Sequence, residues 1–313
     1  MENYHAWVSP KAKMGAFTSI QQALDAAPQD DSLYRIYLAA GEYQESFSIS
    51  RDHVEIIGAG KDKTHIYESI CAGMLKDSGK LVSTLGSRIV AINAQQVSVK
   101  HLSISNRWDY IANVKKQVSD STKIHHPQAV ALLLTENSKD IQLEHLCLDS
   151  FQDTFCTLGG KSQLKQCVIK GNIDFIFGSG HALFEKCELV CKAYPTTSKV
   201  MGYVSAPSTS KLNEVGLVFL RCSVVRENID VKVGSYALGR PWHPTKDFHD
   251  GRYADPDAIG YAAFIECYLD DHIYGWDKMH GLDKNGDKRF FYPDTDARFY
   301  ERNNTGPGAQ RRA

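Results

Sequence analysis

The sequence predicts an all-β fold of the parallel β-helix type, in which successive coils of the chain stack on one another. The main observation is a frame made of an apolar residue, two spacers, a cysteine or leucine, one spacer and a second apolar residue. The frame occurs six times, and its central residues are Leu102, Leu146, Cys167, Cys187, Cys222 and Cys267. Two of the intervals, 146 to 167 and 167 to 187, are close to 20 residues, a repeat length typical of stacked coils. A β-sandwich or a propeller is the alternative, but the shared frame favours the β-helix.

The frame also predicts how each coil is built. The cysteine and the last apolar residue should share one face of a strand, while the first apolar residue sits at a bend or on the opposite face. The longer intervals should hold insertions near residues 106–127, 192–215 and 226–260, which leave the stack as long loops on one side. Such loops often form binding walls. A short helix over residues 19–27 would cap the open N-terminal end of the coil.

Composition limits the classes of function. The chain has 36 basic and 37 acidic residues, so its formal net charge is −1. This balance does not support general nucleic-acid binding, which requires a basic field. No run of 18 apolar residues predicts a membrane-spanning helix, and no signal-peptide pattern is visible at residues 1–10. Nothing resembles a linker, so we expect one domain over residues 1–313 and a monomer.

Two aspartates occupy equivalent places on consecutive coils. Asp153 follows Leu146 by seven residues, and Asp174 follows Cys167 by seven residues. Because stacked strands are about 4.8 Å apart, the two carboxyl groups should lie side by side. Two adjacent carboxyls do not both ionise easily, so one pKa should rise while the other stays low. That division suits a proton donor beside a nucleophile, although aspartate is also common in plain turns.

A series of short motifs surrounds these aspartates along nearly the whole chain. The motifs are GEYQE at 41–45, QAVAL at 128–132, QDTF at 152–155, IDFIFG at 173–178, LGRPW at 238–242, GW at 275–276 and NTGPGA at 304–309. With these motifs in this order, the chain resembles the pectinesterases (pectin methylesterases), a family of carbohydrate esterases, and it looks like a bacterial-type member. Each motif alone is weak, but the ordered set is highly specific.

The resemblance implies a right-handed parallel β-helix and hydrolysis of the methyl esters of polygalacturonate. It implies that Asp174 attacks the ester carbon and that Asp153 protonates methanol and then activates water. Gln128 and Gln152 would donate hydrogen bonds to the oxyanion, and Arg240 would hold Asp174 ionised. From the residues alone, each of these amide and guanidinium groups could instead serve a structural role.

The resemblance also implies a set of substrate contacts. These contacts would come from Phe177, Trp242, Thr245 and Met279, with the aromatic rings packing on sugar rings. Aromatic residues are more often part of a core, which is the alternative for Phe177 and Trp242. The family's acid/base motif often continues with Leu-Tyr, whereas this chain has cysteine at position 156. Cys156 lacks a ring for a sugar contact, so this subsite departs from the family pattern.

Further expectations follow from the family. Bacterial members often join cysteines on neighbouring coils, and Cys167 and Cys187 match that pair, so we expect a disulfide in an oxidising compartment. The alternative is a ladder of small buried thiols. The mechanism needs no metal or other cofactor, and we expect none. The substrate would be methylated homogalacturonan, and the enzyme would be secreted or periplasmic.

Three rival functions remain open. A pectin lyase of this shape usually needs calcium-binding acidic clusters and a basic catalyst, and a hydrolase would be expected to have three aspartates; neither pattern is present. A non-catalytic relative could bind a polysaccharide without chemistry. An esterase for another acyl ester would use the same groups.

Overall fold

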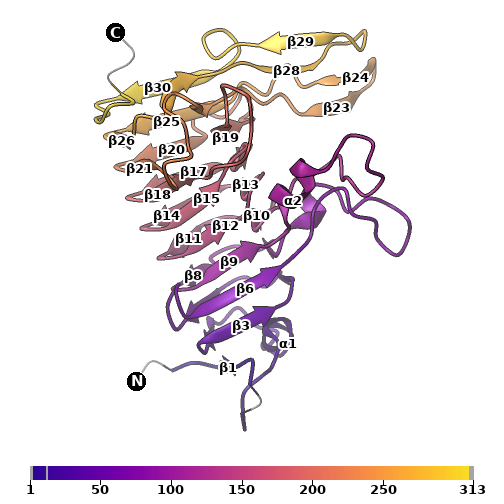
Figure 1. Ribbon diagram of the computed structural model, residues 1–313. Helices are drawn as coiled ribbons and strands as arrows, with labels where there is room; N and C mark the ends of the chain where they lie inside the picture. Colours follow the sequence, from indigo (N-terminus) through magenta and orange to yellow (C-terminus); the bar gives the residue numbers. More distant parts are fainter. Residues whose placement is uncertain (1–2, 12, 310–313) are drawn as a thin grey trace.

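The computed structural model describes residues 3–11 and 13–309. Most strands lie in three parallel sheets that run the length of the molecule, as Figure 1 shows. Sheet A contains β1 (Ala6–Val8), β2 (Tyr34–Leu38), β5 (Val54–Gly58), β8 (Ser98–Lys100), β11 (Ile141–Glu144), β14 (Lys161–Lys165), β17 (His181–Glu185), β20 (Leu217–Leu220), β25 (Tyr261–Ile265) and β30 (Arg298–Arg302).

The other two sheets complete each coil. Sheet B contains β3 (Gly41–Gln44), β6 (Thr64–Glu68), β9 (Ser103–Asn106), β12 (Cys147–Asp149), β15 (Val168–Gly171), β18 (Glu188–Cys191), β21 (Ser223–Arg226) and β26 (Tyr268–Leu269). Sheet C contains β4 (Phe47–Ile49), β7 (Val90–Ile92), β10 (Leu132–Leu134), β13 (Phe155–Thr157), β16 (Ile176–Gly178), β19 (Gly202–Pro207), β22 (Tyr236–Gly239) and β27 (Ile273–Trp276). The predicted parallel β-helix is confirmed.

The repeated frame marks a corner between sheets A and B. Its first apolar residue lies in the strand before the corner, and the bend falls on the residue before the frame centre instead of on the first apolar residue. In the coil of Cys167, strand β14 ends at Lys165, Gln166 turns the chain, and β15 begins at Val168. The residue before each frame centre has a φ between 51° and 57°, at His101, His145, Gln166, Lys186, Arg221 and Glu266. In a regular strand, successive side chains point to opposite faces. The left-handed residue interrupts this pattern, so that both apolar residues of the frame and its central residue face inward.

The frame cysteines form a ladder of thiols. All eight cysteines lie in the described part of the chain, and each is a free thiol. The Cys167 thiol donates to the Leu143 carbonyl at 3.4 Å, and the Cys187 thiol donates to the Leu164 carbonyl at 3.3 Å. The thiols of Cys167 and Cys187 also lie within hydrogen-bonding reach of each other. The structure therefore shows the thiol ladder, and the disulfide expected in an oxidising compartment stays a prediction.

The interior also contains a ladder of phenylalanines on sheet A. Phe184 stacks on Phe219 with ring centroids 4.6 Å apart, and Phe219 stacks on Phe264 at 4.2 Å. All three side chains are completely buried. Parallel strands in register place identical side chains one above the other, so each ring packs against its neighbours in the adjacent coils.

We expect Phe219→Ala to lower the free energy of unfolding by about 3–5 kcal/mol, because it removes the middle ring of this stack and leaves a cavity. Urea denaturation followed by tryptophan fluorescence measures the loss. Ile229→Ala is the control, because Ile229 is an exposed apolar residue and its loss should change stability by less than about 0.5 kcal/mol. Equal effects of the two substitutions would contradict the packing role of Phe219.

The N-terminal cap is present as predicted. Helix α1 (Ile20–Asp25) begins after Ser19, whose side chain accepts from the Gln22 amide. The Glu45 carboxylate accepts from the Ser19 hydroxyl and the Ile20 amide, both at 2.8 Å. These contacts satisfy amides that the first helical turn leaves unpaired, and they fix the helix against the first coils.

The insertions protrude together on one side of the stack, where Figure 1 shows helix α2 and the two hairpins. The segment predicted at 106–127 contains α2 (Tyr110–Lys115). The segments predicted at 192–215 and 226–260 are not single loops, because β19 and β22 interrupt them. The hairpins are β23 (Thr245–Phe248) with β24 (Gly251–Ala254) and β28 (Met279–Leu282) with β29 (Lys288–Phe291). A 3₁₀ turn, η1 (Leu85–Ser87), completes the elements. No helix among the described residues is long and apolar enough to cross a membrane.

Candidate active site

Asp153 and Asp174 lie side by side where two neighbouring strands of sheet C begin. Gln152 pairs with Ile173 in a parallel bridge, and the Asp153 amide donates to the Ile173 carbonyl at 3.1 Å. Both aspartates have positive φ, 66° and 50°, and each is only 8% exposed. The repeat therefore predicts their juxtaposition correctly, because no insertion separates the two coils at this point.

Arg240 holds both carboxylate oxygens of Asp174. Its Nε donates to Oδ1 at 2.8 Å and its Nη2 donates to Oδ2 at 2.6 Å. Burial alone would lower the pKa of Arg240, but the charge and hydrogen bonds of Asp174 outweigh it and raise that pKa above its usual value. The paired geometry stabilises Asp174 as an oriented anion.

Asp153 is the member of the pair whose charged form is disfavoured. Burial raises the pKa of Asp153 well above its usual value, the negative charge of Asp174 raises it further, and Arg240 offsets only part of the shift. A carboxyl group that holds its proton more strongly than usual thus lies next to a carboxylate paired with Arg240. The site has one group that can attack an electrophile and one that can supply a proton.

Gln152 directly precedes Asp153, and Gln128 lies on the neighbouring coil. The Gln152 carbonyl accepts from the Ala129 amide at 3.0 Å, so Gln128 and Gln152 lie on adjacent coils. The Gln128 side-chain Oε1 is buried and has no hydrogen-bond partner among the described residues.

Phe177 and Trp242 contact one another on the outer face of sheet C. Their centroids are 5.6 Å apart with the rings at 65°. Cys156 lies in register with Phe177 and is completely buried in the same apolar cluster, which is separate from the main core. The other members of this cluster are Val130, Leu133, Leu158 and Ala206.

Thr245 and Met279 lie on the two protruding hairpins. Thr245 is exposed at the start of β23, and Met279 is half-buried at the start of β28. The hairpins pack against each other through β24 and β28, so both residues belong to one wall beside sheet C.

The structure contains a second group of packed aromatic side chains near the site, which the sequence did not predict. The ring of Tyr110 in α2 stacks on Phe151 at 4.3 Å and 12°, and Tyr194 meets both rings edge-on. Burial, with smaller contributions from Tyr194 and Asp153, raises the pKa of Tyr110 to about 12. Phe151 immediately precedes Gln152, so its position in the sequence could have indicated an aromatic side chain beside the site. Tyr110 lies in an insertion, where the repeat does not predict which coil a residue contacts.

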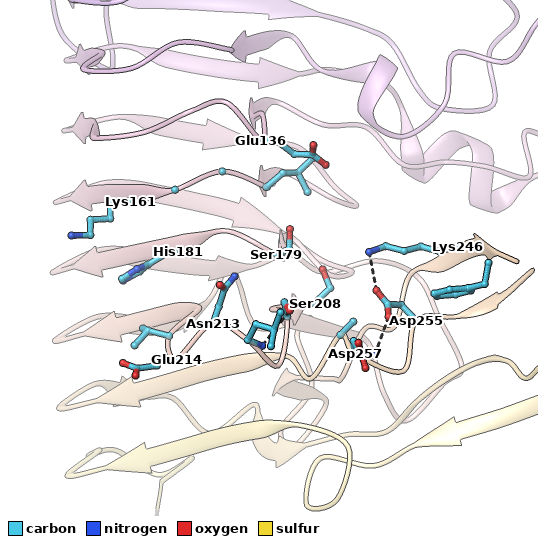
Figure 2. A pocket seen from close by; sticks show the side chains of 18 residues that line it. Glu136, Lys161, Ser179, His181, Ser208, Asn213, Glu214, Lys246, Asp255 and Asp257 are labelled. Carbon is cyan, nitrogen blue, oxygen red and sulfur yellow. Dashed lines mark hydrogen bonds and ion pairs between the residues drawn. The ribbon is translucent and has the colours of Figure 1, made fainter.

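A large cavity adjoins the site without containing the aspartates. It has a volume of about 1010 Å³ and lies where β13 and β16 end, whereas the aspartates lie where these strands begin. Figure 2 shows Ser179 and Ser208 lining it and Lys246 facing Asp255, with a Nζ–Oδ2 distance of 2.8 Å. Leu158 belongs both to this cavity and to the aromatic cluster. The aspartate pair, and not this cavity, defines the candidate site.

One group among the described residues could present three ligands to a metal ion. Ligand atoms of Asp270, Asp271 and His272 lie within 4.8 Å of one another. The Arg226 guanidinium donates to Asp270 at 3.2 Å and also forms an ion pair with Asp271. Because Arg226 already neutralises both carboxylates, we assign no metal to this group.

A β-helix with an arginine-paired carboxylate beside a second buried carboxyl group suits a carboxylic ester hydrolase. The chain belongs to the pectinesterase family, whose sequence profile matches residues 6–312. The predicted family and fold are thereby confirmed.

The individual relatives agree with this membership. The chain is 42% identical to Pectinesterase A from Dickeya dadantii over 98% of this chain and 84% of that protein. Its structure is similar to that of pectin methylesterase PemA from Erwinia chrysanthemi, with a TM-score of 0.96, 41% identity and coverage of 98% and 91% of the two chains. A pectin methylesterase mutant solved in complex with a hexasaccharide gives a TM-score of 0.97 at 40% identity, covering 99% and 91%.

Proposed function

We propose that the protein hydrolyses the methyl esters of pectin to pectate and methanol through an acyl-enzyme on Asp174. The observation that carries this proposal is the pair itself, with Asp174 held by Arg240 through two hydrogen bonds beside the buried carboxyl group of Asp153. The relatives are pectinesterases, and one was solved with a hexasaccharide, which supports a pectin-derived substrate.

In the first step an Asp174 oxygen attacks the carbonyl carbon of the methyl ester. The electron pair moves to the carbonyl oxygen, where the Nε2 groups of Gln128 and Gln152 donate hydrogen bonds. As the tetrahedral intermediate collapses, the C–O bond to the methoxy group breaks and Asp153 transfers its proton to that oxygen. Methanol leaves, and the substrate is bound to Asp174 as an anhydride.

In the second step Asp153, now a carboxylate, removes a proton from water. The resulting hydroxide attacks the substrate carbonyl of the anhydride, and the bond to the Asp174 oxygen breaks. Arg240 stabilises the Asp174 carboxylate as it leaves. Asp153 ends the cycle protonated, as it began, and the product is a galacturonate carboxyl group.

The walls of the site suit a chain of sugar rings. Half-buried Trp242, which packs on the buried Phe177, offers an aromatic face on one side of the pair, and Thr245 and Met279 would contact the polymer from the hairpins. Cys156 is completely buried beneath this surface. Pectin is a cell-wall polymer, and we propose that the enzyme acts outside the cytoplasm.

We expect highly methylated pectin to release methanol while the polymer keeps its length. Methanol is measured by a coupled alcohol oxidase assay, and chain length by size-exclusion chromatography of the same samples. Polygalacturonate without esters is the control and should yield no methanol. Shortened chains would indicate a lyase or a hydrolase, and failure to release methanol would overturn the proposed function.

A further inference from the structure

Tyr203 lies beside the Asp174 turn, on the next strand of sheet C. Its amide donates to the Asn172 carbonyl at 3.0 Å, and two residues later Ser205 pairs with Ile176. The side chain is half-buried. Tyr203 thus belongs to the first coil beyond the one that carries Asp174.

Arg240 belongs to the coil beyond that of Tyr203. Gly239 pairs with Ser205, and the Arg240 amide donates to the Ser205 carbonyl at 3.0 Å. With about 4.8 Å between strands, the Arg240 side chain must cross the whole of β19 to reach Asp174. It crosses directly over the Tyr203 ring, with Cζ only 3.8 Å from the ring centroid.

We propose that Tyr203 is a positioning residue for the esterase reaction: its ring fixes the plane of the Arg240 guanidinium so that Nε and Nη2 both meet Asp174. The proposal rests on the proposed function. The two hydrogen bonds to Asp174 restrain the guanidinium within its plane, and the ring restrains it against rotation out of that plane. Stacking on an aromatic face is a preferred environment for arginine and strengthens when both groups are shielded from water.

The position of Arg240 matters because a second carboxyl group lies within its electrostatic reach. Asp153 also contributes to the raised pKa of Arg240. A guanidinium freed from the ring could turn from Asp174 toward Asp153. Positive charge near Asp153 would favour loss of its proton, and the division of roles between the two aspartates would weaken.

The ring should be sufficient for this role. Burial raises the pKa of the Tyr203 phenol, so the hydroxyl stays neutral and adds no charge to the site. Phenylalanine keeps the aromatic face, whereas leucine keeps much of the apolar bulk and loses the face. Tyr203→Phe therefore tests the contribution of the hydroxyl, and Tyr203→Leu tests the contribution of the aromatic face beyond that of apolar packing.

The test compares Tyr203→Leu and Tyr203→Phe with Tyr261→Leu as a matched control. Tyr261 is a half-buried tyrosine on sheet A with Arg298 over its ring at 5.7 Å, away from the site. We expect Tyr203→Leu to lower kcat about tenfold with KM changed less than about twofold, because a desolvated stacking contact contributes on that order. Tyr203→Phe and the control should keep kcat within about twofold of wild type. Circular dichroism and Tm establish that each variant is folded.

Three outcomes would overturn the proposal: an unchanged kcat in Tyr203→Leu, a rise in KM alone, which would indicate a sugar contact, or an equal loss in Tyr203→Phe, which would indicate a role for the hydroxyl.

A second measurement does not depend on turnover. Hydrogen exchange of the Arg240 Nε–H, followed by NMR, should be slow in wild type and Tyr203→Phe and fast in Tyr203→Leu. If wild type released no methanol, the proposed function would fail, while the exchange data would still test the positioning of Arg240.

Discussion

Asp174→Asn should abolish methanol release, with kcat reduced by about 10⁴-fold or more, as for the loss of a nucleophile in other covalent hydrolases. An amide cannot form the anhydride under these conditions. The substitution also removes the only negative charge that Arg240 contacts through two hydrogen bonds. Because this leaves a largely buried cation without its partner, we expect a loss of about 3 kcal/mol in the free energy of unfolding.

Initial rates of methanol release and urea denaturation measure the two effects. Glu266→Gln is the control, because it removes an exposed carboxylate that pairs with Arg221 at 2.8 Å on the far corner of the coil. That variant should keep wild-type turnover and nearly wild-type stability. A folded Asp174→Asn enzyme with substantial activity would show that another residue attacks the ester.

The aspartate pair could be predicted because its two coils follow each other without an insertion. The interval of 21 residues between Asp153 and Asp174 equals the interval between Leu146 and Cys167, so the sequence carries the register directly. Arg240 lies 66 residues after Asp174, beyond two insertions of different length. The repeat therefore does not predict that Arg240 contacts Asp174. Only the family motif pointed to it.

Other features depended on interactions that leave no periodic trace. The corner residue of each coil adopts a left-handed conformation, but residues as different as His101, Lys186 and Glu266 occupy it, and none is glycine. Nothing in the sequence therefore places the bend at the residue before each frame centre. Tyr110 and Tyr203 lie in or next to insertions, so their approach to the site follows from three-dimensional packing alone. Equivalent positions on adjacent coils bring the thiols of Cys167 and Cys187 together, but they do not determine whether the pair is oxidised.

Asp153→Asn should separate activity from stability. The variant lacks the proton donor of the first step and the base of the second, so we expect kcat to fall about 10³-fold while polymer binding stays normal. The folded protein should nevertheless become more stable at neutral pH, because the substitution removes an acid whose ionisation the buried site opposes.

The sign of the pH dependence follows from the raised pKa of Asp153. Between the usual value near 3.8 and the higher value in the folded protein, the native state binds more protons than the unfolded state. Wild-type stability therefore falls as pH rises through this window, and the loss persists above it. Asparagine does not titrate, so the Tm of Asp153→Asn should match wild type near pH 3.5 and exceed it by about 3 °C at pH 7.

Asp255→Asn provides a control of opposite sign. Burial opposes the charge of Asp255, but hydrogen bonds from Lys246 and from the Asp257 amide outweigh it and lower the pKa of Asp255. Its stabilising contribution is present above the usual aspartate pKa and is lost as pH falls, so Asp255→Asn should destabilise the protein most at neutral pH. Thermal melts of both variants from pH 3.5 to pH 8 distinguish the two cases.

Two results would contradict the role of Asp153. If Asp153→Asn were no more stable than wild type at any pH, Asp153 would not be the carboxyl group that the site keeps protonated. If Asp153→Asn lost polymer binding but kept its turnover, the roles of the two aspartates would be reversed.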